Sequence, residues 1–281
     1  IELNARDING LAPLHWASIQ GYADIVELLL SEEGIDVNVK SAAMRTPLHV
    51  AADHGHVDIA KLLLKAEGTE INARDKRGST PLIQASFFGY LSVVELLLRE
   101  GGDLKARCED FACTALHYAS YEGRGDVVKF LLGTEGIEIN ARSADGSTPL
   151  YLASLRGHAS VVKELLEKDD IDINAGTEDG FTPLHGATLM GDSTVIKILL
   201  EHERIDVTAE DVWDGRTALH LAFACGDLYT IDALLSNANS DVQTLDIHGL
   251  TPAQSALLEG HEEVVEKFCS PRLSPENQWR G

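Results

Sequence analysis

The sequence predicts an all-α solenoid of stacked helix-turn-helix units, joined by short β-turn or hairpin connectors. A block running from threonine (alanine in the first copy) to alanine occurs eight times, starting at positions 12, 46, 80, 114, 148, 182, 217 and 251. Successive copies start 34 residues apart, with one step of 35. A glycine and then an apolar helical pattern follow every block. A fixed period of this length is typical of stacked repeats, because one unit alone cannot bury its apolar face.

The third copy shows how each unit starts. Asp75–Gly78 has the composition of a tight turn, in which glycine supplies a backbone conformation closed to most residues. Thr80 and Pro81 then predict a helix start, with a hydroxyl N-cap followed by proline at the first helical position. Leu82 and Ala85 follow at helical spacing and should face inward. This segment is therefore predicted to be a turn followed by a short helix.

The second half of the unit is a longer apolar helix and a connector. Gly89 should end the first helix in a left-handed conformation. A second helix is predicted from near Ser92, with its valines and leucines forming a wide apolar face until Gly101 and Gly102 stop it. Between units lies a short extended piece, as at residues 35–38, 71–74 and 171–174.

These motifs together resemble the ankyrin repeat. The resemblance rests on the Thr-Pro-Leu-His-x-Ala block, the glycine-histidine position and the paired leucines, and it covers about residues 5 to 269. The sequence departs from the family motif at several positions: Ala115 and Ala218 replace proline, Met44 replaces a turn glycine, Ala253-Gln254 replaces Leu-His, and Ile83 and Tyr151 replace the histidine. The resemblance implies an ankyrin-repeat solenoid.

We expect a single ankyrin-repeat domain over residues 1–269, with repeats starting near 7, 41, 75, 109, 143, 177, 212 and 246. The last unit has charges on its second helix, as a terminal cap should. Residues 270–281 contain two prolines and are predicted to be a loose tail. The first residues match a connector without its preceding helices, which indicates a chain cut from a longer protein.

The amino-acid composition makes some classes of partner and some cellular locations unfavourable. The formal net charge of −22 disfavours binding to nucleic acid or to anionic membranes, because like charges repel. Acids are concentrated in the lengthened connectors, where the sequence allows two interpretations: solubility, or docking of a basic partner segment. No apolar run approaches the roughly 20 residues needed to span a bilayer. Four irregularly spaced cysteines fit neither a disulfide framework nor a zinc site, which favours reduced thiols in a cytosolic or nuclear compartment.

No catalytic, cofactor or metal site is predicted. Most of the histidines fall on framework positions of the repeat, and His54, His202 and His248 lie in separate repeats. The sequence has no nucleophile elbow and no phosphate-binding loop. Cys108 and Cys113 have acidic neighbours, which favours a pair of unreactive free thiols in a loop. Connector asparagines match a position that can be hydroxylated in animal ankyrin repeats, but hydrogen bonding within the connector is the interpretation we favour.

The family resemblance places the binding surface on the concave side, at the turn tips and first helices. Apolar and aromatic residues are concentrated there in repeats three to seven, which favours a partner-binding patch over packing between repeats. The predicted partner-binding residues are Phe87, Phe88, Phe111, Tyr121, Leu155, Phe181, Leu189, Met190 and Trp213.

Three hypotheses of function follow. The first is a monomeric, non-catalytic scaffold for protein-protein interaction, whose concave groove binds a partner with a basic or apolar segment. The second is a groove that binds a small molecule and could act on it, which a closed, aromatic-lined cavity would favour. The third is an architectural spacer within a larger multidomain signalling protein, which a groove without exposed aromatics would favour. The fold alone does not choose among them.

Overall fold

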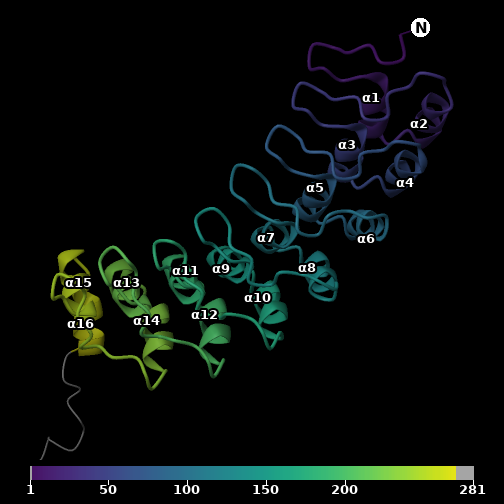
Figure 1. The fold of residues 1–281 in the computed structure, drawn as a ribbon. Coiled ribbons are helices and arrows are strands. Elements are labelled where there is room, and N and C mark those ends of the chain that lie inside the picture. Colours follow the sequence, from purple (N-terminus) through teal and green to yellow (C-terminus); the bar gives the residue numbers. More distant parts are fainter. Residues whose placement is uncertain (1, 270–281) are drawn as a thin grey trace, which may run out of the picture. The chain divides into compact units, whose positions relative to one another are not determined.

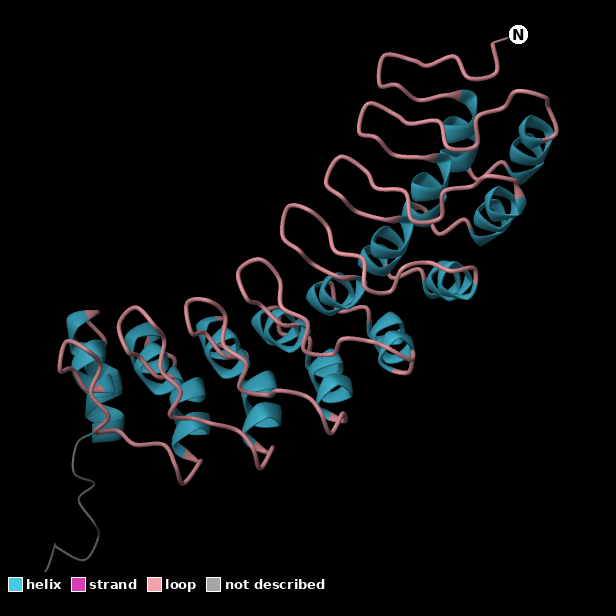
Figure 2. Cartoon of the chain, in the orientation of Figure 1, coloured by secondary structure: helices cyan, strands magenta, loops and turns pink. Residues whose placement is uncertain are grey.

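The computed structural model describes residues 2–269, and within them every regular element is an α-helix (Figures 1 and 2). The predicted all-α class is confirmed. The predicted tail at 270–281 lies outside the described residues. The chain divides into two compact units, Ile1–Asp172 and Ile173–Gly281, which we call the N-terminal unit and the C-terminal unit. The single domain expected over residues 1–269 stays a prediction.

The N-terminal unit consists of five helix pairs. The helices are α1 (Pro13–Gln20), α2 (Ala23–Leu30), α3 (Pro47–Asp53), α4 (Val57–Lys65), α5 (Pro81–Phe88), α6 (Leu91–Arg99), α7 (Ala115–Tyr121), α8 (Gly125–Leu132), α9 (Pro149–Leu155) and α10 (Ala159–Leu166). First helices pack on first helices, from α1 through α9, and second helices pack on second helices, from α2 through α10 (Figure 1). The unit is therefore a two-row stack in which each pair contacts its neighbours.

The C-terminal unit repeats this arrangement with three pairs. Its helices are α11 (Pro183–Leu189), α12 (Ser193–Leu200), α13 (Ala218–Cys225), α14 (Leu228–Leu235), α15 (Pro252–Leu258) and α16 (Glu262–Cys269). The first helix α13 packs between α11 and α15, and α12 packs against α14.

The repeated threonine begins the first helix by a specific hydrogen bond. In six repeats its hydroxyl accepts a hydrogen bond from the backbone N–H three residues later, as from His49 to Thr46. Proline follows at the first helical position in six repeats, where no N–H is needed. This confirms the helix start predicted from the sequence.

The glycine between the two helices is required by its conformation and by close packing. Gly123 has φ +68°, and a Cβ placed on it would lie 2.6 Å from Nδ1 of His158 in the next repeat. His158 in turn directs its Nε2 to the carbonyl of Tyr121 at 2.9 Å. Because a side chain at this glycine would displace that contact, the glycine also sets the distance between neighbouring repeats.

A short hairpin, which we call a finger, precedes each first helix. Each finger is closed by a hydrogen bond from its first N–H to its last carbonyl; the fingers are residues 7–11, 41–45, 75–79, 108–113, 143–147, 177–181, 211–216 and 246–250. Fingers four and seven are one residue longer than the others. In repeat four the even period hides this insertion, because the segment from Thr80 to the finger is one residue shorter than its equivalents.

None of the helices in the described residues combines the length and the apolarity needed to cross a bilayer.

Candidate functional site

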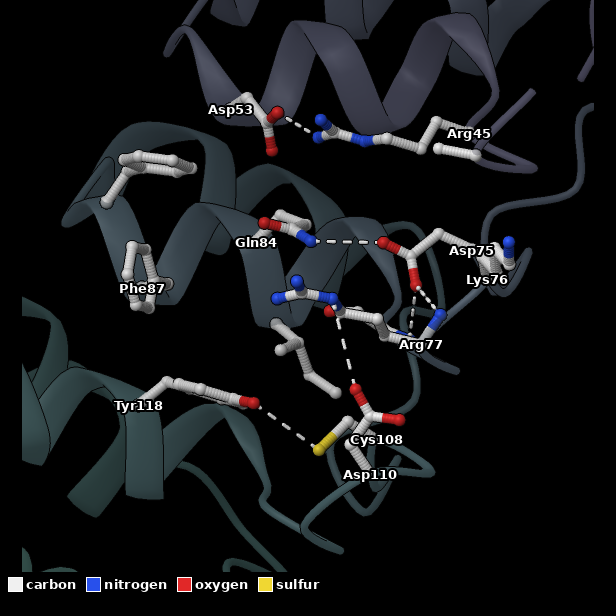
Figure 3. Close-up of a pocket in the computed structure, with 14 residues that line it drawn as sticks. Arg45, Asp53, Asp75, Lys76, Arg77, Gln84, Phe87, Cys108, Asp110 and Tyr118 are labelled. Atoms are coloured by element: carbon white, nitrogen blue, oxygen red, sulfur yellow. Dashed lines mark hydrogen bonds and ion pairs between the residues drawn. The ribbon is translucent and has the colours of Figure 1, made fainter. Parts of the chain in front are cut away.

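The face formed by the fingers and first helices of the N-terminal unit contains a cavity of about 670 Å³. Its wall includes Phe87 and Phe88 at the end of α5, Gln84 one turn earlier, and Tyr118 on α7 (Figure 3). Phe87 packs edge-on against Phe88 with ring centroids 5.0 Å apart, and against Tyr118 at 5.7 Å. The aromatic wall is therefore built from two adjacent repeats.

Charged groups of both signs surround this aromatic wall. The Arg45 guanidinium pairs with the Asp53 carboxylate, whose side chain is only 8% exposed. Asp75 accepts the backbone N–H groups of Arg77 and Ser79 at 2.9 Å and the Gln84 amide at 3.3 Å. These bonds hold the third finger against α5 (Figure 3).

The mouth of the cavity opens to solvent. Arg77 and Asp110 form a pair 3.9 Å apart at the finger tips, and the Arg77 side chain is 80% exposed. Burial lowers the pKa of Arg45 at the opposite end. The cavity is thus an open groove with a polar rim, and not the closed cavity that would favour a small-molecule site.

A second cavity of about 350 Å³ lies one repeat further along the same unit. Phe111, Tyr121 and Leu152 line it, and it shares Arg77 and Tyr118 with the first cavity. The Arg156 guanidinium lies over the Tyr121 ring at 4.5 Å, a cation-π contact that covers one face of the ring. The two cavities together form a groove along repeats two to five.

The nine predicted partner-binding residues fall into two groups by exposure. The exposed ones are Phe88 (39%), Phe111 (60%), Leu189 (41%), Met190 (62%) and Trp213 (68%). The half-buried ones are Phe87, Tyr121, Leu155 and Phe181. The half-buried group takes part in packing, as Phe181 does edge-on against His185 at 5.8 Å.

The structure brings part of this set together. Phe87 and Phe88 line the first cavity, Phe111 and Tyr121 line the second, and Leu155 lines neither. Within the C-terminal unit, Leu189 and Met190 lie at the end of α11, whereas Trp213 lies on the seventh finger. Beside Trp213, Val212 is equally exposed at 69%.

Sequence reasoning missed Gln84, Tyr118 and Leu152 as groove residues. All three occupy the variable position of the Thr-Pro-Leu-His-x-Ala block. That position lies one residue after the buried motif histidine, so it points toward the finger side of the first helix. The residue at this position differs among the repeats, from tryptophan in the first to glycine in the sixth. These groove residues could have been predicted from that variation.

The motif histidines form inter-repeat hydrogen bonds, as the resemblance implied. In His49, Nδ1 accepts the Thr46 N–H at 3.2 Å and Nε2 donates to the Ser79 carbonyl of the next repeat at 3.0 Å. Burial lowers the pKa of His49 and of His117 to about 4, despite the backbone bonds that favour the protonated form. These side chains are therefore neutral structural groups at pH 7.

The three histidines outside the framework positions are also hydrogen-bonded. His54 directs Nδ1 to the Val50 carbonyl at 2.9 Å, His202 accepts the Arg204 N–H at 3.2 Å, and His248 lies 3.3 Å from Asp214. Among the described residues, no three His, Cys, Asp or Glu side chains gather closely enough to hold a metal ion.

Cys108 and Cys113 are free thiols in a loop, as predicted, but their surroundings differ from the prediction. Both residues are almost fully buried, and they lie at the two ends of the fourth finger. The pKa of Cys108 is lowered to about 5, because hydrogen bonds from the Cys113 thiol, the Tyr118 hydroxyl and backbone N–H groups stabilise its thiolate. The expectation of an unreactive pair, which rested on the acidic neighbours, stays a prediction.

The described helices and fingers form an α-solenoid, and comparison with known proteins places it in a family. A model of ankyrin repeats (three copies) matches residues 1–75, 48–143 and 116–211, and a single ankyrin repeat model matches residues 214–245. The chain therefore belongs to the ankyrin repeat family, whose members are generally protein-protein interaction modules.

One solved structure illustrates the similarity. The crystal structure of the human ASB11 ankyrin repeat domain shares 28% sequence identity with this chain at a TM-score of 0.74. The match covers 82% of this chain and 100% of that one. No curated protein matches the chain.

Proposed function

We propose that this protein is a non-catalytic recognition scaffold that binds a protein partner along the groove of repeats two to five. The single observation that carries this proposal is the aromatic-walled groove with exposed Phe88 and Phe111 at its rim. Partly exposed aromatic side chains beside a concave surface are the usual anchors of protein interfaces. Most of the groove is held by hydrogen bonds before binding, so little ordering is needed when a partner docks.

The two lengthened fingers provide a second argument. Finger four contains Phe111, finger seven contains Val212 and Trp213, and all three side chains are at least 60% exposed. Apolar groups on the two longest fingers are better explained by contact with a partner than by packing, because within their units they remain largely in water.

The exposed aromatics also weigh against a purely architectural spacer, for which such side chains would have no use. The open mouth of the groove weighs against a small-molecule site. We propose a partner segment that combines apolar side chains for the groove with basic side chains for the surrounding acids. Asp110 and Asp145 on neighbouring fingers are acids within reach of such a segment.

Alanine substitution tests the proposal. Phe88→Ala and Phe111→Ala should each weaken partner binding by about 2 kcal/mol, which is about 30-fold in Kd, as expected for interface anchors. The control is Tyr229→Ala on α14, whose side chain is 82% exposed outside the groove. Circular dichroism and thermal unfolding check that each variant remains folded. Unchanged affinity in folded groove variants would refute the proposed binding surface.

A further inference from the structure

The fourth finger is the only one among the described residues that begins and ends with cysteine. Cys108 donates its backbone N–H to the Cys113 carbonyl at 3.0 Å, which closes the finger. This bond keeps the backbones of the two cysteines side by side at the base of the finger. Disulfides span Cα separations of about 4.4–6.8 Å. The two cysteines are adjacent, and their side chains interact, since the Cys113 thiol contributes to lowering the pKa of Cys108.

The sulfur of Cys108 lies among hydrogen-bond donors. The Tyr118 hydroxyl is 3.4 Å from Sγ, and the Cys113 thiol and the backbone N–H groups of Phe111 and Cys113 contribute with it to lowering the pKa of Cys108. Hydrogen-bond donors around a sulfur stabilise its thiolate form. The same contact raises the pKa of Cys113, which remains a protonated thiol beside the Cys108 thiolate.

The two sulfurs can also be reached. Cys108 lines the first cavity and Cys113 lines the second, so small molecules in the groove can approach either residue although each is less than 10% exposed (Figure 3). A thiolate beside a protonated thiol, both adjacent to solvent-filled space, is the arrangement in which one sulfur reacts and the other resolves.

We propose that Cys108 and Cys113 form an oxidation-sensitive dithiol site, which hydrogen peroxide converts to an intrachain disulfide. The Cys108 thiolate attacks one peroxide oxygen, the O–O bond breaks, and the departing hydroxide takes up a proton to form water. The resulting sulfenic acid is attacked by the Cys113 sulfur, the S–S bond forms, and a second water leaves. In total, two thiols and one peroxide give one disulfide and two waters. A low-molecular-weight thiol reverses the change by thiol-disulfide exchange, in which two of its molecules become one disulfide.

The exposed Cys225 provides an internal contrast. Partial burial and the nearby carboxylates of Asp227 and Glu259 raise the pKa of this thiol. It should therefore react slowly at neutral pH, although it is more exposed than Cys108. If exposure alone set the rate, Cys225 would react before Cys108. The order in which the two thiols react therefore distinguishes control by pKa from control by exposure.

The first test uses the whole chain with Cys225→Ser and Cys269→Ser, which leaves only the pair. Treatment with one equivalent of hydrogen peroxide should remove two hydrogen atoms from the intact mass, and peptide mapping should join Cys108 to Cys113. When Cys113→Ser is combined with these two substitutions, the reaction should stop at a sulfenic acid on Cys108, which dimedone labels. Oxidation without an intrachain link, or identical products with and without Cys113, would overturn the proposal.

A second measurement needs no substitution at the pair. Phenylarsine oxide binds two thiols only when they are close together, so the reduced protein should bind one equivalent and thereby protect Cys108 and Cys113 from iodoacetamide. Tyr118→Phe should slow alkylation of Cys108 severalfold at pH 6 and leave the rate at pH 9 unchanged, because it removes a donor to the thiolate. Failure to bind the arsenical, or Cys225 alkylating faster than Cys108 at pH 6, would rule out the site.

Discussion

At the scale of single residues, the buried histidines do the most to define the stack. Each motif histidine accepts a hydrogen bond from its own helix start and donates one to the next repeat, which ties a local cap to a tertiary contact. His15, His49, His117, His185 and His220 all have a lowered pKa, with burial as the largest cause. Protonation therefore opposes folding at five positions.

This predicts a specific pH dependence. In the folded chain the pKa of His49 and His117 is about 4, below the ordinary value of 6.5, so the unfolded chain binds these protons first. The contribution of the two neutral histidines to the free energy of unfolding is complete above about pH 6.5 and is lost as the pH falls toward 4. Between pH 7 and pH 5, each should lose about 2 kcal/mol of unfolding free energy.

Urea denaturation at the two pH values measures this loss. Glutamine at both positions removes the titrating groups, so the double variant should be less stable at pH 7 and also less sensitive to pH. A double variant with the full pH sensitivity of the unchanged protein would show that other groups cause it.

Finger conformation gives a second prediction at this scale. Met44 has φ +59° at a position where six of the other seven fingers have glycine, and it is 46% exposed. Met44→Gly should raise the unfolding free energy by on the order of 0.5 kcal/mol, because it relieves a left-handed backbone at a side chain that is nearly half exposed.

The matched control is Gly78→Ala, at the same position of the next finger. Its Cβ would lie 2.4 Å from Cγ of Glu109 and 2.7 Å from that residue's backbone nitrogen. It should lower stability by about 1–3 kcal/mol. Thermal unfolding compares the two variants, and a change of the same sign in both would contradict this account of the fingers.

At the scale of elements, the connectors are joined by asparagine side chains. The Asn38 amide donates to the Gly68 carbonyl at 2.8 Å, and its oxygen accepts the Glu70 N–H at 2.9 Å. Asn4, Asn72, Asn140 and Asn174 make the same pair of bonds with the following connector. These asparagines are hydrogen-bonded, as we favoured, but their partners lie in the next connector and not within their own.

Asn38→Ala should therefore cost about 1–2 kcal/mol of stability, since two bonds between neighbouring repeats are lost at an exposed site. Lys105 occupies the equivalent position in repeat four, where no such amide exists, and Lys105→Ala is the matched control with an expected change below about 0.5 kcal/mol. Equal effects of the two substitutions on denaturant unfolding would show that the asparagine bonds contribute little.

At the scale of the whole molecule, the sequence predicted the helices of every repeat and missed the side-chain contacts that occur only once. The threonine, glycine and leucine positions recur, so periodicity was enough to place every helix pair. The groove depends on contacts that occur once, such as Arg45 with Asp53 and Tyr118 with Cys108, and no repeated pattern encodes them. The extra residue of finger four was invisible for a related reason, because a compensating deletion before it preserved the spacing.

Charge gives a prediction at the same scale. The connector acids are exposed in both units, including Glu32, Glu135 and Asp170 in the first and Glu201 in the second. If they attract a basic partner segment, partner binding should weaken severalfold when the salt concentration is raised from about 0.05 to about 0.5 M. The added salt shortens the Debye length and screens the attraction between exposed charges. Binding that is insensitive to salt would leave solubility as the role of these acids.

The most direct test of the account is affinity capture with the whole chain and with the groove variant Phe88→Ala, Phe111→Ala. The matched control replaces Tyr22 and Tyr229 by alanine, since both are exposed on or beside second helices. We predict that the unchanged chain and the control capture the same protein and that the groove variant, although folded, does not. Capture of that protein by the folded groove variant, or its loss from the control alone, would contradict the central claim.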